Sequence, residues 1–420
     1  MNILWHMPTL QRSGCGLSHR ALRLARELAS VGHKIVFSVA LDKANVERSR
    51  IEEFAVELLP VETKEPLHWA LQSTGRSAAA RRLAVRLSDR HDLFVTCQPE
   101  MVWAYRRLKP QAKIVFVCGG TALLHEPRER SEQARQPFMS RAAFVGDRLL
   151  KRRLERKAFQ AADVVVFDSR TTRSLVIRTY GIDETKCRAV IGAVDTADFT
   201  PIGHDVRASA RKTLGIDPCR SVVAWTGRLS PEKNLSLLIR AAARCQSAPI
   251  LLLVGDGPLR ADLVRLCDGE GVAARTVWPG LVADVRPFLQ AADVFAFPSC
   301  GESFGGSLVE AMACGLPCLA LSPDGKTIRT ASAEILEDGV SGRLVAPPTV
   351  EALAGALDRL LADASLRARL GRGARARVER EFTWQRAGRE LIEAIAALAP
   401  RAAPYAALPM DGCSCALQST

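Results

Sequence analysis

Residues 292–317 read ADVFAFPSCGESFGGSLVEAMACGLP, and this stretch decides the fold class. The apolar run Val294–Phe297 ends at Pro298, as a buried strand does where a loop begins. Gly305 and Gly306 follow, and after them comes an apolar segment with helical spacing. A strand, a glycine-rich loop and a helix in this order indicate a parallel α/β sheet, with the loop at the carboxyl edge where such sheets bind ligands.

The same alternation of strands and helices continues on both sides of this stretch. In the C-terminal half, further strands are expected at Val222–Thr226, Ile250–Val254, 276–278 and 317–320. In the N-terminal half, strands are expected at 3–7, 35–39, Leu93–Thr96, Ile114–Cys118 and Val164–Phe167. The sequence therefore predicts an α/β protein with two tandem Rossmann-like domains.

The expected domain boundaries follow from the point at which the pattern restarts. A polar stretch at 203–212 separates the two halves. The expected units are an N-terminal domain at 1–202, a C-terminal domain at 203–381, a terminal helix at 382–400 and a flexible Ala/Pro-rich tail at 401–420. The total of 420 residues agrees with two to three domains of roughly 150 residues each.

Composition excludes several classes of protein. A hydrophobic fraction of 48% with 25% charged residues excludes a disordered chain and a small disulfide-stapled scaffold. The 12 cysteines are scattered without a second pair at zinc-site spacing, so we expect no structural metal. The first residues do not resemble a signal peptide, and no apolar run reaches about 18 residues. We therefore expect a cytoplasmic protein.

The positive charge is concentrated in the N-terminal half. Residues 1–200 hold 33 basic and 22 acidic side chains, whereas residues 201–420 hold 25 and 23. The segment 141–159 carries seven of the basic side chains, interleaved with apolar ones. This segment fits an amphipathic helix on an anionic membrane, and it also fits a packed helix with a solvated basic face. No aromatic platform or reading helix accompanies the charge, so nucleic acid is not an expected partner.

Two loops in the C-terminal half carry candidate ligand-binding residues. The segment TGRLSPEKNL at 226–235 lies between an expected strand and an expected helix. Gly227 lets the backbone turn there, and Arg228 and Lys233 can converge on one anion; a solvated loop with ordinary surface charges is the alternative. The segment GDGP at 255–258 is a similar junction, and its Asp256 is interpreted as part of a tight turn rather than as a nucleotide contact.

The loop of the opening stretch is the third candidate. Free N–H groups at the start of a helix, here at 307–309, attract a diphosphate. Glu302 lies in the loop and Glu310 in the helix, so the two carboxylates can reach opposite ends of one ligand. Glu310 has apolar neighbours on both sides, and a carboxylate in such surroundings needs a partner.

Together these segments resemble the retaining GT-B glycosyltransferases of family 4. The matching segments are GRLSPEKNL at 227–235, VGDGP at 254–258 and E-x7-E at 302–310, and the likeness continues to about Trp384. The first half resembles the family more loosely, through Gly14-x-Gly16, GHKI at 32–35, ADV at 162–164 with Ser169, and VDTADFTP at 194–201. The resemblance implies the GT-B fold, with a cleft between the two domains and a C-terminal helix that packs back on the N-terminal domain.

The resemblance also implies transfer of a sugar from a nucleoside-diphosphate sugar to an acceptor hydroxyl, with retention at the anomeric carbon. The implied catalytic residues are Arg228 and Lys233, which bind the diphosphate and stabilise the leaving phosphate, and Glu302, which binds hydroxyls of the donor sugar. Glu310 would bind the ribose. The full set of implied donor contacts is Gly14, Gly16, Gly227, Arg228, Lys233, Gly255, Gly257, Glu302, Phe304, Gly305, Gly306, Ser307, Leu308 and Glu310.

The implied donor is a UDP-sugar or a GDP-sugar, and no metal is expected. Fixed cations and a helix N-terminus do the electrostatic work that a metal ion does elsewhere, and the chain has no Asp-x-Asp loop motif. The implied acceptor is a glycan or lipid-linked molecule bound by the basic N-terminal domain, and the product a polysaccharide, glycolipid or glycoconjugate. Such a protein would work in the cytoplasm, including as a peripheral protein at the inner face of the cell membrane.

Two departures from the family pattern leave alternatives open. Gly192-Ala193 stand where many relatives have Asn-Gly, and the strand Ile114–Cys118 leads into an unusual loop, GGT at 119–121. Candidates for lining the acceptor or sugar site near this loop are Cys118, Gly119 and His125. The alternatives are a catalytically silent GT-B protein that binds a nucleotide sugar or acts as a scaffold, and a sugar-nucleotide epimerase on the same fold.

Overall fold

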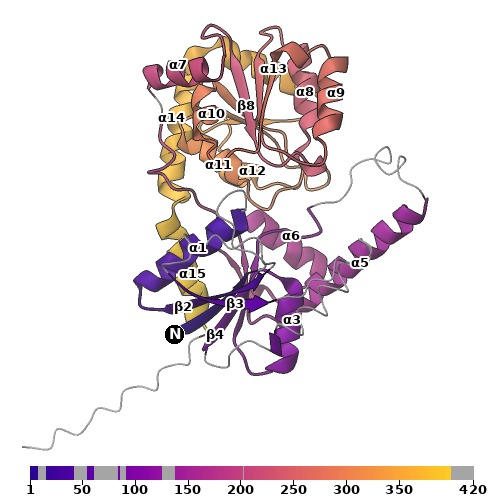
Figure 1. The fold of residues 1–420 in the computed structure, drawn as a ribbon, viewed down its shortest axis with the longest axis vertical. Coiled ribbons are helices and arrows are strands. Elements are labelled where there is room, and N and C mark those ends of the chain that lie inside the picture. Colours follow the sequence, from indigo (N-terminus) through magenta and orange to yellow (C-terminus); the bar gives the residue numbers. More distant parts are fainter. Residues whose placement is uncertain are drawn as a thin grey trace, which may run out of the picture.

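The structure is a computed structural model that describes residues 1–7, 16–41, 54–60, 84–85, 91–124, 138–201 and 203–398. These residues form two α/β domains stacked along the long axis of the molecule, each built on one sheet (Figure 1). The expected α/β fold with two tandem Rossmann-like domains is confirmed. The predicted boundary at residue 202 lies between the last strand of the first sheet and the first helix of the second domain.

The N-terminal domain is built on a seven-stranded sheet with the order β3-β2-β1-β4-β5-β6-β7. Its strands, which all pair in parallel, are β1 (Asn2–Met7), β2 (Lys34–Leu41), β3 (Ala55–Pro60), β4 (Leu93–Thr96), β5 (Ile114–Cys118), β6 (Val164–Phe167) and β7 (Cys187–Ala189). The central strands β1, β4 and β5 are buried and mostly apolar because helices cover both faces of the sheet. Helix α1 (Gly16–Ser30) packs on one face; α3 (Pro99–Leu108), α5 (Phe138–Ala161) and α6 (Arg170–Tyr180) pack on the other.

The C-terminal domain repeats this design on a six-stranded parallel sheet with the order β10-β9-β8-β11-β12-β13. Its strands are β8 (Val222–Thr226), β9 (Ile250–Val254), β10 (Thr276–Gly280), β11 (Val294–Phe297), β12 (Cys318–Leu321) and β13 (Arg343–Val345). Its helices are α7 (His204–Thr213), α8 (Leu235–Arg244), α9 (Arg260–Gly269), α10 (Arg286–Ala291), α11 (Gly306–Ala313), α12 (Ser332–Ile335), α13 (Val350–Ala362) and α14 (Ala364–Glu381). Helices α8, α9 and α13 cover one face; α10, α11 and α14 cover the other.

The polar stretch at 203–212 is a helix rather than an unstructured connection. Helix α7 begins just after the predicted boundary, and its Arg211 is buried. The Arg211 guanidinium forms an ion pair with Asp293 at 2.7 Å and donates to the carbonyl of Ala291 at 2.9 Å. Arg207 pairs with the same carboxylate at 3.4 Å, and Ala210 packs against the core, so this mostly polar helix is anchored to the C-terminal domain.

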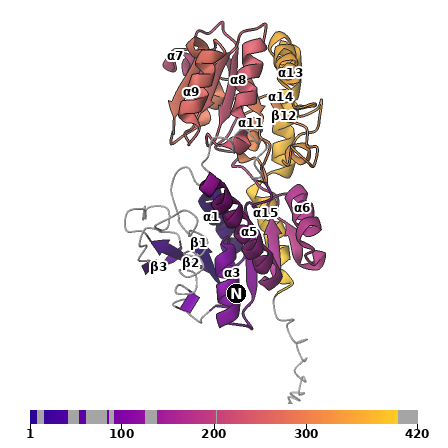
Figure 2. The same cartoon turned by 90° about the vertical axis from the view of Figure 1, so that its right-hand side faces the viewer.

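The last described helix, α15 (Trp384–Ala396), crosses back from the C-terminal domain to the N-terminal domain. It follows α14 directly and packs beside α1, as the yellow segment shows in Figures 1 and 2. Trp384 and Leu391 are buried in the same core cluster as the strands of the first sheet. A Cβ atom on Gly388 would lie 2.5 Å from Cβ of Glu27, so the two helices approach as closely as a glycine allows. The expected return of the C-terminal helix is confirmed.

Candidate active site

The loops after β8 and β9 lie against each other at the carboxyl edge of the C-terminal sheet. Gly255 has a φ of 134°, and a Cβ atom there would lie 1.8 Å from the carbonyl oxygen of Gly227. A Cβ atom on Gly257 would lie 2.5 Å from the carbonyl oxygen of Leu229. Asp256 accepts a hydrogen bond from the Gly257 N–H at 2.7 Å, which agrees with the tight turn expected there. The glycines therefore allow contact between two loops that border the candidate donor site.

Lys233 and Glu302, which are far apart in the sequence, are brought into direct contact. Lys233 ends the short 3₁₀ helix Pro231–Lys233 that follows the β8 loop, and its ammonium group forms an ion pair with the Glu302 carboxylate. Ser299 also donates to Glu302, at 3.4 Å. Arg228 is exposed, and no side chain in the described part of the chain pairs with it. Without a ligand, the Glu302 carboxylate thus neutralises Lys233, and Arg228 is open to an incoming anion.

The N-terminus of α11 is open and is reached through two glycines. Gly305 has a φ of 116°, and a Cβ atom there would lie 3.0 Å from the ring of Phe297. Among the described residues, no side chain caps the helix. The N–H groups of Leu308 and Val309 were predicted to be free for a ligand. Instead they donate to the Gly305 carbonyl at 3.0 and 3.2 Å. The N–H groups that remain for an anion among the described residues are therefore those at 306 and 307.

Glu310 lies one turn further into α11. Its side chain is partly buried among apolar residues, and no described residue forms a hydrogen bond or an ion pair with it. Burial raises the pKa of Glu310 from 4.5 to about 7. A carboxylate removed from water without a partner is costly, so a position of this kind is typical of a ligand-binding residue.

Phe304 lies between the two domains. It is 8% exposed; its ring stacks at a tilt against Phe382, with centroids 5.9 Å apart. A Cβ atom on Gly192 would lie 2.3 Å from the Phe304 ring, so the glycine of the Gly192-Ala193 departure makes room for it. The predicted donor contact of Phe304 is thereby restricted to its main chain, because the ring is used for packing.

The predicted residues of the N-terminal domain are only partly described. Gly14 and His125 lie outside the described residues, and Gly16 is the first residue of α1. Cys118 is buried at the end of β5, where its thiol contacts the Gly120 carbonyl and burial raises its pKa. The thiol therefore lies in the protein core, whereas the Gly119 carbonyl faces the C-terminal domain and accepts a hydrogen bond from Ser303 at 3.0 Å.

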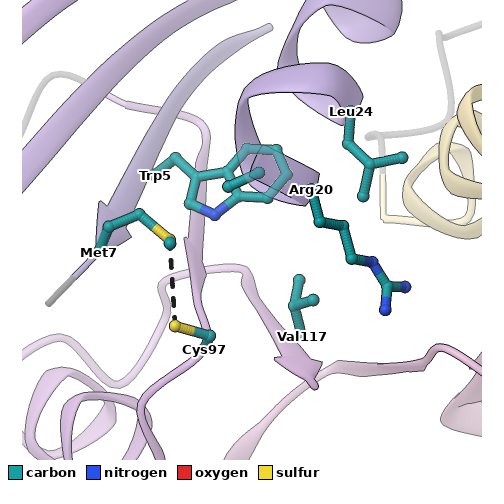
Figure 3. A pocket seen from close by; sticks show the side chains of 7 residues that line it. Trp5, Met7, Arg20, Leu24, Cys97 and Val117 are labelled. Carbon is teal, nitrogen blue, oxygen red and sulfur yellow. Dashed lines mark hydrogen bonds between the residues drawn. The ribbon is translucent and has the colours of Figure 1, made fainter. Parts of the chain in front are cut away.

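A small void lies beneath α1 at the carboxyl end of the first sheet (Figure 3). Its volume of about 10 Å³ is near the minimum that can hold one water molecule. The residues that line it include Trp5, Met7 and Cys97, and the Met7 and Cys97 sulfur atoms lie 3.9 Å apart. A sugar does not fit in this space, so the void is not an acceptor pocket.

Sequence reasoning missed the polar contacts between the two domains. Ser303 bonds to Asp168 at 2.9 Å, and Asp168 forms a buried ion pair with Arg20 at 3.2 Å. Glu334 of α12 accepts hydrogen bonds at 3.1 Å from the first N–H groups of α6. One signal was present in the sequence, because Asp168 directly follows a buried strand. The partners of these groups lie more than 100 residues away, and no local pattern identifies them.

No group of three or more potential metal ligands occurs among the described residues. No helix in that part of the chain is long and apolar enough to cross a membrane. Helix α5, which contains the basic segment 141–159, directs Leu154, Ala158 and Phe159 into the core or against it. Lys151, Arg153 and Arg156 of the same helix are exposed. Of the two interpretations of this segment, the structure therefore shows a packed helix with a solvated basic face over its described side chains.

Comparison with known proteins gives matches over both domains. The model of the family described as "Glycosyl transferases group 1" matches residues 206–377, and that of "Glycosyltransferase Family 4" matches residues 15–198. A D-inositol 3-phosphate glycosyltransferase of Salinispora arenicola is 36% identical over 282 residues, which are 62% of this chain and 60% of that protein. The chain thus matches less than two thirds of the length of this relative.

Solved structures share the two-domain architecture. Sucrose-phosphate synthase from Thermosynechococcus elongatus has a TM-score of 0.75 at 21% identity, with 95% of this chain and 99% of that chain covered. HepE from Anabaena, solved in complex with UDP and glucose, has a TM-score of 0.71 at 20% identity, with 94% and 99% covered. At these identities the likeness shows the fold, which is GT-B. With both domains matched by family models, the chain belongs to the group 1 glycosyltransferases of family 4.

Proposed function

We propose that this protein is a retaining, metal-independent glycosyltransferase that moves a sugar from a nucleoside-diphosphate sugar to an acceptor hydroxyl. The observation that carries the proposal is the arrangement at the carboxyl edge of the second sheet. The groups are an exposed Arg228, a Lys233–Glu302 pair, the N-terminus of α11, and Glu310, which has no partner among the described residues; all belong to neighbouring loops or to α11. The cations and the helix N-terminus suit a diphosphate, and the carboxylates suit the hydroxyls of a sugar and a ribose.

The nucleotide is assigned to the C-terminal domain. The diphosphate would lie at the N-terminus of α11, where the N–H groups of Gly306 and Ser307 and the Arg228 guanidinium provide positive potential. Glu310, with a pKa of about 7, would accept hydrogen bonds from the ribose hydroxyls in its ionised form. The ligand would thus supply a partner that no described residue provides for this carboxylate.

The Lys233–Glu302 ion pair would exchange its partners when the donor binds. In the ligand-free state each group neutralises the other. A diphosphate beside Lys233 would compete for the ammonium group, and sugar hydroxyls would donate to Glu302. As the glycosidic bond breaks, negative charge grows on the leaving phosphate, and fixed cations stabilise that charge more than they stabilise the ground state. Retention is consistent with the leaving phosphate itself taking the acceptor proton on the same face of the sugar.

The donor is proposed to be a UDP-sugar or a GDP-sugar, and the acceptor an anionic glycan or a lipid-linked molecule. The relative named above is a D-inositol 3-phosphate glycosyltransferase, and HepE was solved with UDP and glucose. The excess of basic residues in the N-terminal half supports an anionic acceptor.

A thermal-shift screen of UDP-, GDP- and ADP-sugars tests the donor, because a ligand that binds the folded state raises the melting temperature. Transfer is then assayed with the donor that binds, in the presence and absence of EDTA, and the anomeric configuration of the product is read by NMR. We expect Lys233→Ala to lower turnover by at least about 100-fold. Lys212→Ala, a change at an exposed lysine of α7, is the matched control. No donor binding across the panel, or full activity of Lys233→Ala, contradicts the proposal.

A peripheral contact with anionic membrane is proposed through the exposed basic face of α5. Its apolar face packs in the domain core, so attraction would be electrostatic, without insertion of this helix. Co-sedimentation with phosphatidylglycerol vesicles at low salt is expected for the native chain and reduced for a Lys151→Glu/Arg153→Glu variant. Equal binding to phosphatidylcholine vesicles, or binding that salt does not weaken, contradicts this contact.

A further inference from the structure

The segment 301–304 of the donor loop is packed against the N-terminal domain at Gly301, Ser303 and Phe304. A Cβ atom on Gly301 would lie 1.9 Å from the carbonyl oxygen of Leu124. The ring of Phe304 fills the space that a side chain on Gly192 would take. The loop that carries Glu302 is therefore fixed at both ends by residues of the other domain.

Ser303, between these two points, bonds to the N-terminal domain through both its side chain and its main chain. Its single hydroxyl proton is shared between two acceptors, Oδ2 of Asp168 at 2.9 Å and the carbonyl oxygen of Gly119 at 3.0 Å from the hydroxyl oxygen. Its own carbonyl accepts hydrogen bonds from the Ser169 hydroxyl and, at 3.1 Å, from the Thr172 hydroxyl. We call this set of hydrogen bonds the Ser303 contact.

Asp168 is the charged member of the Ser303 contact, and its surroundings make it sensitive to domain separation. The ion pair with Arg20 is buried on both sides, with side-chain exposures of 8% and 10%. Oδ1 of Asp168 is buried without a hydrogen-bond partner among the described residues. If the domains separated, water would reach this carboxylate and replace Ser303. The buried, incompletely bonded carboxylate therefore depends on Ser303 in the closed arrangement.

The Ser303 contact is directly connected to the candidate donor site. Glu302 precedes Ser303 in the chain, and its N–H donates to the carbonyl of Arg329 at 3.2 Å. The Arg329 guanidinium donates across the domain boundary to the Leu123 carbonyl at 2.9 Å. The main chain at Glu302 and at Ser303 is therefore held by hydrogen bonds that connect, directly or through Arg329, to the N-terminal domain.

We propose that Asp168 and Ser303 are positioning residues for the donor site: their hydrogen bond forms when the domains are closed and holds the adjacent Glu302 in place beside Lys233. Neither residue touches the reacting groups. The effect on turnover rests on the proposed function, whereas the effect on domain closure does not. Closure is in this way linked to the placement of one carboxylate.

The test uses Ser303→Ala, Asp168→Asn and the double variant in the full chain. Ser303→Ala is the primary variant, because Asp168→Asn also leaves the buried Arg20 without its counter-charge. Ser174→Ala, on the same helix as Thr172, and Ser236→Ala, on α8, are matched controls. Small-angle X-ray scattering without ligand is expected to give a larger radius of gyration for Ser303→Ala than for the native chain and both controls.

Kinetics separate positioning from a general loss of structure. We expect Ser303→Ala to lower kcat about tenfold, with little change in the Kd for the free nucleoside diphosphate, which binds the C-terminal domain. If Asp168 acts through Ser303, the double variant should lose no more kcat than Asp168→Asn alone. An unchanged radius of gyration in Ser303→Ala, an unchanged kcat, or losses that multiply in the double variant would each overturn the proposal.

These outcomes are distinct from failure of the proposed function. If the native chain neither transfers nor hydrolyses any nucleotide sugar, the proposed function fails, and scattering still decides whether the Ser303 contact controls closure. If the native chain transfers sugar and Ser303→Ala matches it in scattering or in kcat, the function stands and the positioning role is wrong.

Discussion

Glu310 shows how the environment of one residue sets its chemistry. In the ligand-free protein its carboxylate has no described partner, and burial raises its pKa from 4.5 to about 7. Between these two values the folded protein retains a proton that the unfolded chain has lost. Stability therefore falls as the pH rises through this window, by up to about 3 kcal/mol, and the contribution is fully favourable only below the lower value.

The prediction at this scale concerns nucleotide binding. Ribose hydroxyls would donate to the ionised carboxylate, so affinity for the nucleoside diphosphate should increase as the pH rises through about 7. Binding should also release a proton, which calorimetry in buffers of different ionisation enthalpy measures. Glu310→Gln should bind more weakly and lose this pH dependence. Glu351→Gln, an exposed change in α13, serves as the control. An unchanged pH profile in Glu310→Gln would show that another group titrates.

The elements that were predictable from the sequence are those with strong local signals. Strands β1, β2, β4, β5, β6, β8, β9, β11 and β12 are mostly buried, mostly apolar runs, and each was expected close to its observed place. The half-buried β10 was also expected close to its observed place. Strands β3, β7 and β13 were not expected. Strands β7 and β13 have only three residues each and are partly exposed edge strands. Neighbouring strands therefore define them more than their own composition does.

Several residues of the candidate site were predictable from the sequence, but their contacts with one another and with the other domain were not. Glu310 was identifiable because a charged residue interrupts an apolar helix, and Lys233 and Glu302 because their motifs lie at strand–loop–helix junctions. Their mutual ion pair was not predictable, since it depends on how two loops are placed in space. The roles of Phe304 and Gly192 were missed for the same reason: each is explained by a residue of the other domain.

Helix α15 provides the prediction at the scale of elements. Leu391 is 1% exposed in the core cluster of the N-terminal domain. Leu391→Ala should therefore lower the free energy of unfolding by about 2–5 kcal/mol through lost burial and a cavity. Glu393→Ala, an exposed position on the same helix, should change it by less than about 0.5 kcal/mol. Chemical denaturation measures both. Equal stability of the two variants would mean that α15 contributes little to the domain that it contacts.

The arrangement of the whole molecule depends on close backbone contact between the domains. An alanine at 301 would place a Cβ atom 1.9 Å from the Leu124 carbonyl oxygen, a distance that only separation of the two domains or a shift of the loop relieves. Gly301→Ala should therefore increase the radius of gyration and lower turnover while the C-terminal domain stays folded. Gly355→Ala, where the added atom meets no described atom within 4 Å, is the control. Native scattering from Gly301→Ala would show that the loop yields instead.

The path of α15 also affects the order in which the protein is completed on the ribosome. The N-terminal sheet is synthesised first, yet one face of it is covered in part by a helix that begins at Trp384. Until that helix emerges, the apolar surface that receives Leu391 and Ile395 is open to water and to other chains. The N-terminal domain is therefore translated first but completes its core last, and chaperones are expected to bind it during that interval.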